Sequence, residues 1–205
     1  MNDQNVIENP TSWNTLWDLR YKGKVAMRDD ISMLWTTALS LGYKNIYSLT
    51  KTQLTNVRNK LFKFNDLASL YYSGGNIEIE LARQGKLVAY NSWYDPSKRL
   101  NTSGKKFTMI IPKEGAVVMF DSYMLSIDCE NTSIAHEFIN YQISPFVQQQ
   151  MINITGLAPA NLETLSLLKP DKIKAHHLDE PDYFNRMILW DHMHRKIFTT
   201  RYYRM

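Results

Sequence analysis

The feature that most constrains the fold is an alternation of short apolar runs with helical periodicity between residues 24 and 90. Three short apolar runs are typical of buried strands: 24–28, 67–72 and 87–90. Three intervening segments repeat apolar side chains at helical spacing: 31–42, 49–65 and 77–85. This alternation favours a largely parallel sheet covered by helices on both faces. The sequence therefore predicts an α/β fold for this part of the chain.

The second half of the chain has a different pattern. Two more strands are predicted at 107–111 and 117–127, on either side of a Pro-Lys-Glu-Gly turn at 112–115. After residue 131 no strand is predicted, and the helical segments are 132–143, 145–154, 160–168 and about 191–203. Such a chain has two domains, or one domain whose sheet partner is missing.

Composition and motifs argue against several classes of function. The 205 residues include 24 basic and 20 acidic side chains, a scattered net charge of +4 that does not favour nucleic-acid binding. The single Cys129 cannot form an internal disulfide, and no spacing fits a metal site, a phosphate loop or a nucleophile motif. We therefore expect no cofactor, no metal and no enzymatic activity. No apolar stretch is long enough for membrane insertion.

Two adjacent carboxylates, Asp29 and Asp30, lie where the first predicted strand gives way to a helix. An acidic side chain there can cap free backbone N–H groups and interact with the positive end of the helix dipole. Capping and ligand binding are both open explanations for this pair.

Three stretches follow one another in the order found in a known family. They are TSWNTLWDLRYKGKVAMRDD at 11–30, IIPKEGAVVMFDSYMLSID at 110–128 and NTSIAHEFINYQISPFVQQQMINITGLAPANLETLSLL at 131–168. In this order they resemble bacterial spermidine/putrescine-binding proteins, the soluble substrate-binding components of polyamine ABC importers.

The resemblance implies a periplasmic-binding-protein-like lobe of type II with a mixed, largely parallel sheet, followed by a mainly helical C-terminal part. Residues 10–112 would form the second lobe. Residues 113–205 would form the returning strand and the C-terminal helices of an incomplete first lobe, because about the N-terminal third of the family's sequence, with most of that lobe, is missing. The implied partners are a polyamine and an ABC transporter permease, and the implied location is the periplasm. Because no signal peptide is visible, we expect a cytoplasmic chain if Met1 is the true start.

The resemblance also implies three ligand-binding residues. Asp30 falls at a binding Asp of the second lobe, Asp121 at the carboxylate of the returning strand, and Tyr90 where the family has a Trp. A polyamine needs such carboxylates for its ammonium groups and aromatic faces for its methylenes. Three positions depart from the family pattern by lacking a Glu, a Trp and a Tyr, and these are Met33, Met119 and Leu157. They predict fewer charge partners and less stacking.

Two alternatives belong to other functional classes. The chain could be a remnant of a split or truncated gene that acts only through self-association. It could also be a basic interaction module that uses four residues near its end: Arg195, Lys196, Arg201 and Arg204.

The predicted helices after residue 131 carry apolar side chains that, by the resemblance, pack on strands of the missing third. These side chains are Ile134, Phe138, Ile139, Phe146, Val147, Ile152 and Ile154. Because exposed apolar surface and unpaired strand edges favour association, we expect a homodimer.

Overall fold

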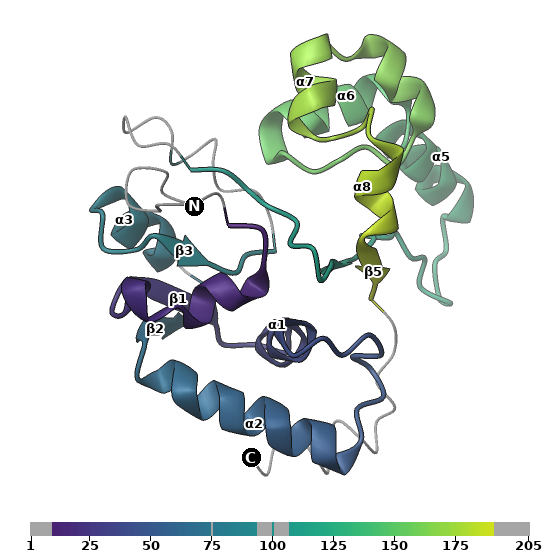
Figure 1. Cartoon of the computed structure of the whole chain (residues 1–205). Helices are drawn as coiled ribbons and strands as arrows, with labels where there is room; N and C mark the ends of the chain where they lie inside the picture. The colour runs from purple at the N-terminus through teal and green to yellow at the C-terminus, as the bar shows by residue number, and fades with distance from the viewer. Residues whose placement is uncertain (1–9, 75, 94–99, 101–106, 191–205) are drawn as a thin grey trace. The chain divides into compact units, whose positions relative to one another are not determined.

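The computed structural model describes residues 10–74, 76–93, 100 and 107–190. The chain divides into two compact units (Figure 1). The first comprises Met1–Val118 with Arg186–Met205, and the second comprises Met119–Asn185. The helix predicted at about 191–203 and the four C-terminal basic residues lie outside the described residues. The lobe boundaries 10–112 and 113–205 remain a prediction.

A parallel three-stranded sheet organises the first unit. β1 (Val25–Arg28) is its central strand, with β2 (Ala68–Tyr72) on one side and β3 (Ala89–Tyr90) on the other. Both neighbours run parallel to β1. The α/β class and the parallel sheet predicted from the sequence are therefore confirmed.

Helices connect these strands, as the periodicity predicts. The helical elements of the first unit are η1 (Trp13–Trp17), η2 (Leu19–Tyr21), α1 (Ser32–Ser40), α2 (Lys51–Asn65) and α3 (Ile77–Arg83). α2 begins with a capping box, in which Thr50 and Gln53 each accept a hydrogen bond from the other's backbone N–H. This local signal explains why the start of α2 could be read from the sequence.

The core lies on both faces of β1. Val25 and Met27 are fully buried in a cluster with Phe64 of α2, whereas Ala26 points the other way into a cluster with Ile79 of α3. Alternate side chains of a strand point to opposite faces, so both faces of β1 must be covered. This double burial fixes the strand whose carboxyl end carries the candidate site.

A second, two-stranded sheet joins distant parts of the chain. β4 (Ala116–Val118) pairs in parallel with β5 (Met187–Leu189). The predicted strand 117–127 is wrong beyond Val118, because β5 offers partners for only three residues and residues 119–127 are exposed. The expectation that no strand follows residue 131 is also wrong. Of the predicted strand 107–111, only a single bridge at Phe107 is present.

The turn before β4 is held against η1. Glu114 accepts hydrogen bonds from the Ser12 hydroxyl and from the backbone N–H of Trp13, the latter at 3.3 Å. The Trp13 indole N–H donates to the carbonyl of Gly115 at 2.7 Å. Gly115 has a φ of +95°, and a Cβ built on it would lie 2.7 Å from the Arg186 carbonyl oxygen. Only glycine fits this close approach.

The second unit is helical. Its elements are α5 (Thr132–Gln142), α6 (Pro145–Thr155), η4 (Leu162–Leu167), α7 (Pro170–Ala175) and α8 (Pro181–Asn185). α6 packs on η4, and Val147 and Ile152 of α6 are buried. The expectation that these two side chains need a partner is therefore wrong, because the unit covers them itself. No helix in the described part of the chain is long and apolar enough to cross a lipid bilayer.

The Gly115→Ala substitution should destabilise the first unit. Its Cβ would overlap the Arg186 carbonyl in addition to forcing a positive φ, so we expect a loss of about 2 kcal/mol or more in the free energy of unfolding. Gly42→Ala is the matched control, since Gly42 has a φ of +82° and no atom within 4 Å of its built Cβ. Urea unfolding of both variants measures the difference. Equal losses would contradict the close approach at Gly115.

Candidate functional site

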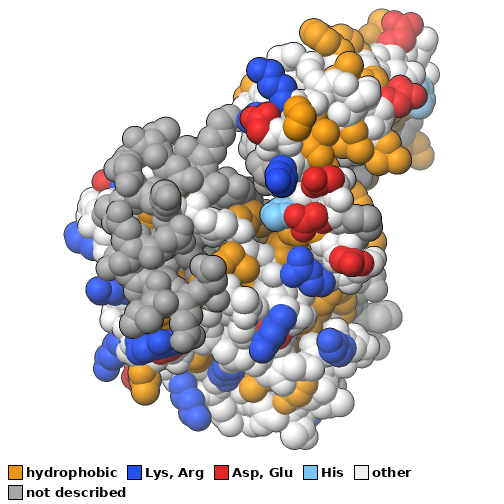
Figure 2. Space-filling view, turned by 45° about the horizontal axis from the view of Figure 1, so that its top comes forward, with side chains coloured by type: hydrophobic (Ala, Val, Ile, Leu, Met, Phe, Trp, Pro, Cys, Tyr) orange, Lys and Arg blue, Asp and Glu red, His pale blue; other side chains and the backbone are white. Residues whose placement is uncertain are grey.

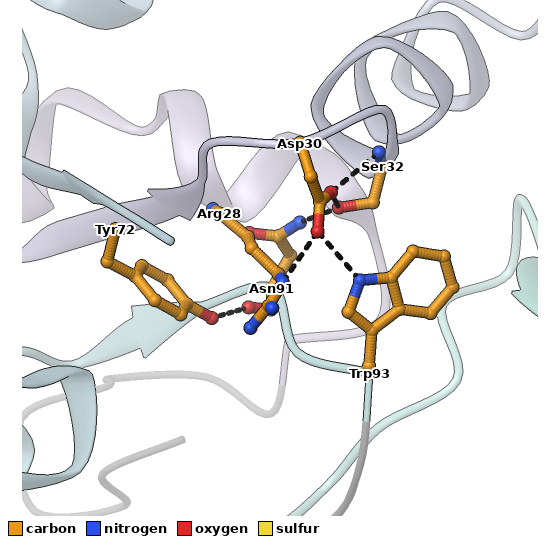
Figure 3. Close-up of polar contacts among 6 residues, drawn as sticks. All are labelled: Arg28, Asp30, Ser32, Tyr72, Asn91 and Trp93. Atoms are coloured by element: carbon orange, nitrogen blue, oxygen red, sulfur yellow. Dashed lines mark hydrogen bonds and ion pairs between the residues drawn. The ribbon is translucent and has the colours of Figure 1, made fainter. Parts of the chain in front are cut away.

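The candidate site lies at the carboxyl ends of β1 and β3. The strand order β2-β1-β3 means that the chain leaves β1 toward β2 and later returns to the other side of β1. Ligands of open α/β sheets bind at such a reversal, outside the carboxyl ends of the strands. Asp30 follows β1, and Asn91 and Trp93 follow β3, so the reversal brings their side chains together (Figure 3).

The Asp30 carboxylate accepts four hydrogen bonds. Its Oδ1 accepts from the backbone N–H of Ser32 at 2.8 Å and from the Ser32 hydroxyl at 2.5 Å. Its Oδ2 accepts from Arg28 Nε at 2.6 Å and from the Trp93 indole N–H at 2.9 Å. Arg28 and Trp93 reach this oxygen from its two sides (Figure 3). Four donors match the acceptor capacity of a carboxylate, so Asp30 is saturated.

These contacts keep Asp30 ionised. Burial raises the pKa of its carboxyl, but the hydrogen bonds from Ser32, Trp93 and Arg28 together outweigh burial and hold the pKa below its ordinary value. Asp30 therefore brings a negative charge to the strand ends at neutral pH, and it accepts a hydrogen bond from the backbone N–H of Ser32, the first residue of α1. Its role in ligand binding remains a prediction.

Asn91 connects the elements around Asp30. Its buried side chain accepts a hydrogen bond from the backbone N–H of Arg28 at 2.7 Å and donates to the Ser32 hydroxyl at 3.0 Å. Its backbone carbonyl accepts a hydrogen bond from the Tyr72 hydroxyl. The ends of β1, β2 and β3 and the start of α1 are thus linked through one residue.

An aromatic cluster adjoins the carboxylate. The Trp93 ring stacks on Trp190, with centroids 5.3 Å apart and planes at 15°. The Trp35 ring meets both of them edge-on, at 6.1 Å from Trp93 and 4.9 Å from Trp190. The backbone N–H of Trp190 donates a hydrogen bond to the backbone carbonyl of Val118 at 2.8 Å, which continues the pairing of β4 with β5. Trp190 remains partly exposed and offers an apolar face close to the charge of Asp30.

A small cavity of about 40 Å³ opens beside this cluster. Trp13, Trp35 and Trp93 form its apolar walls, and Ser32 and Asn91 provide polar groups. This volume accommodates water but not an extended diamine. A ligand would therefore bind over the strand ends rather than inside the first unit.

The three residues expected to bind a ligand lie in different surroundings. Asp30 is at the centre of the site. Tyr90 ends β3, and its ring meets Tyr72 edge-on at 6.1 Å within the core cluster under α3. Asp121 belongs to the second unit, where it is exposed and has no polar partner among the described residues. The assignment of all three to one ligand remains a prediction.

The three departures from the family pattern also differ in their surroundings. Met33 is partly buried and packs against the core cluster that contains Met27 and Phe64. Met119 and Leu157 are exposed in the second unit. Met33 thus has a packing role that requires no ligand.

Sequence reasoning missed four residues of this site: Arg28, Asn91, Trp93 and Trp190. Arg28 ends the predicted strand 24–28, and Asn91 and Trp93 lie within three residues of the end of the predicted strand 87–90. Their position at strand ends was the signal that could have identified them. Trp190 had no such signal, because β5 was not predicted.

A metal site was also considered. Within the described ranges, no three His, Cys, Asp or Glu side chains gather to hold a metal ion. His177 Nδ1 lies 2.9 Å from Glu180 Oε1 in an exposed pair of the second unit.

Comparisons with known proteins identify the family of this chain. The profile of the family described as bacterial extracellular solute-binding protein matches residues 1–187. The spermidine/putrescine-binding periplasmic protein of Escherichia coli (strain K12) is 26% identical over 162 residues, which are 78% of this chain and 46% of that protein. The spermidine/putrescine-binding periplasmic protein 1 of Haemophilus influenzae is 24% identical over 166 residues, which are 77% of this chain and 43% of that protein. The chain thus spans less than half the length of both relatives.

Solved structures show the same fold. The spermidine/putrescine ABC transporter substrate-binding protein of Streptococcus pneumoniae superposes with a TM-score of 0.81 at 21% identity, covering 96% of this chain and 61% of that one. A putative spermidine/putrescine ABC transporter from Listeria monocytogenes gives 0.79 at 21% identity, with the same two coverages. These likenesses confirm the type II fold.

The family profile and the relatives confirm the resemblance seen in the sequence. They also confirm that this is a family of binding proteins and not of enzymes. The chain belongs to the bacterial extracellular solute-binding protein family.

Proposed function

We propose that this chain binds an amine-bearing solute of the spermidine or putrescine type for an ABC importer, at the carboxyl ends of β1 and β3. The observation that carries the proposal is the ionised Asp30 carboxylate beside an aromatic stack, at the point where the strand order reverses. Ammonium groups pair with carboxylates, and methylene chains pack on aromatic faces. Both kinds of contact are available here.

Each proposed residue has a distinct role. Asp30 provides a negative charge for one ammonium group, and Asp121 provides a second negative charge. Tyr90, with the Trp93–Trp190 stack, offers aromatic surface to the methylenes. The names of the relatives support a polyamine as the ligand, an ABC transporter as the partner and the periplasm as the location. The permease of that transporter would be the subunit that the chain contacts.

Replacement of the two carboxylates tests the proposed ligand contacts. Asp30→Asn and Asp121→Asn should each weaken putrescine and spermidine binding about tenfold to a hundredfold, because each removes a negative charge that attracts an ammonium group. Asp29→Asn is the matched control, since the Asp29 carboxylate is exposed and has no polar contact among the described residues. Isothermal titration calorimetry measures the three affinities. Unchanged binding in both Asp30→Asn and Asp121→Asn would contradict the assignment.

The low pKa of Asp30 predicts how its contribution to stability depends on pH. A carboxyl whose pKa is lower in the folded than in the unfolded chain stabilises the fold above the unfolded value, about 3.9. That stabilisation is lost as the pH falls through the folded-state pKa. The difference between the unfolding free energies of the native chain and Asp30→Asn should therefore be constant between about pH 7 and 5 and should shrink as the pH falls below about 3.9. Urea titrations check this, and a difference that grows on acidification would contradict it.

We also propose that the chain self-associates through the second unit. Four apolar side chains of α5 and α6 are more than half exposed: Ile134, Phe138, Phe146 and Ile154. Figure 2 shows exposed apolar side chains over this unit, at its upper right. Burial of such surface contributes about 25 cal/mol per Å², which favours pairing with a second copy.

Charged substitutions on this surface test self-association. The double variant Phe138→Glu, Phe146→Glu should shift the chain from dimer to monomer, because each carboxylate would be desolvated in the interface. Light scattering at micromolar concentration measures the mass. Leu19→Glu, at an exposed apolar residue of the first unit, is the control and should leave the dimer intact. A native chain that is monomeric under these conditions would contradict the proposal.

A further inference from the structure

The guanidinium of Arg28 forms an ion pair through one of its three nitrogens. Its Nε donates to Asp30 at 2.6 Å, and its carbon lies 5.8 Å from the centre of the Tyr72 ring. The two terminal nitrogens have no hydrogen-bond acceptor in the part of the chain that the structure describes. The side chain is only 22% exposed, so these donors are at the site and are partly withdrawn from bulk water.

The chain contains a second Arg–Asp pair two positions apart in the sequence, Arg20 and Asp18. Its geometry differs, so sequence spacing alone does not explain why the terminal nitrogens of Arg28 lack an acceptor among the described residues. Arg20 lies above the ring of Tyr21 and pairs with Asp18, as Arg28 pairs with Asp30 above Tyr72. Arg20 closes its pair with two nitrogens, Nε at 2.9 Å and Nη2 at 2.6 Å from the same oxygen. In Arg28 the terminal nitrogens are left for another acceptor.

The charges at this edge do not favour a purely cationic ligand. Arg28 offsets part of the charge of Asp30, and the four acceptor positions of that carboxylate are already filled. A diamine bound here would bring an ammonium group close to the guanidinium. A planar anion, in contrast, can accept two parallel hydrogen bonds from the terminal nitrogens of an arginine.

We propose that the solute bound at this edge carries a carboxylate, held by the terminal nitrogens of Arg28, in addition to its amine. The ligand class is then an amino acid whose two charged groups are separated by a methylene chain. Asp30 orients the guanidinium through Nε and attracts the amine through its charge without a direct hydrogen bond, and Trp93 and Trp190 offer their stacked rings to the methylenes. This inference rests on the proposed function and specifies its ligand.

Two probes of equal length test the proposal. 5-Aminopentanoate and putrescine share a four-methylene chain and one ammonium group, and they differ only in a carboxylate or a second ammonium at the other end. Calorimetric titration of the full 205-residue chain should show the amino acid binding about tenfold or more tightly than the diamine. Arg28→Gln should weaken binding of the amino acid by a similar factor and should not weaken that of putrescine.

Two further variants separate a ligand contact from a general effect. Arg20→Gln removes the comparable pair at Asp18 and should leave both affinities unchanged. Arg28→Lys keeps the charge but not the two parallel donors, so it should retain an intermediate affinity for 5-aminopentanoate. Thermal unfolding of each variant verifies that it folds. If Arg28→Gln does not fold, two other results test the inference: the preference of the native chain for 5-aminopentanoate over putrescine, and the affinity of Arg28→Lys for 5-aminopentanoate.

The outcomes distinguish this inference from the proposed function. The inference would be overturned if putrescine bound at least as tightly as 5-aminopentanoate and the Arg28→Gln substitution did not change its affinity. The proposed diamine site would then still hold. Preference for the amino acid, lost in Arg28→Gln, would establish the inference and make the diamine the weaker ligand. No binding of either probe would overturn both.

Discussion

The site depends on the carboxylate of Asp30, because three separate segments donate hydrogen bonds to it. These donors come from the end of β1 through Arg28, from the start of α1 through Ser32 and from the segment after β3 through Trp93. A buried donor that loses its acceptor costs about 1–3 kcal/mol. One ionised side chain therefore holds together the edge of the sheet at which a ligand would bind.

The core of the first unit gives this edge its rigidity. Val25 and Met27 are buried on one face of β1 and Ala26 on the other, so the strand cannot shift without exposing a face. The side chains at its end are consequently held in place before a ligand arrives. Binding sites built on rigid elements lose less entropy on binding than sites on mobile loops. This explains how a short strand can carry charged groups at defined distances.

Local patterns predicted the elements whose formation depends on local signals. The capping box of α2, the apolar repeat of α1 and the proline that begins α6 all lie within one or two turns of the structure they specify. Strands near residue 118 were predicted poorly, because an extended segment becomes a strand only if a partner lies beside it. β4 ends at Val118 where its pairing with β5 ends, and that partner comes from about 70 residues further along the chain.

The sequence by itself determined the α/β class of the first unit through its periodicity and its family through the order of three motifs, and it placed Asp30 at the end of a strand. Only the tertiary structure decided that Arg28 pairs with Asp30 and that Trp190 stacks on Trp93. Both contacts depend on side-chain direction or on strands distant in the sequence, and neither is encoded in local spacing. The charge and the shape that a ligand meets at this edge are therefore properties of the folded chain.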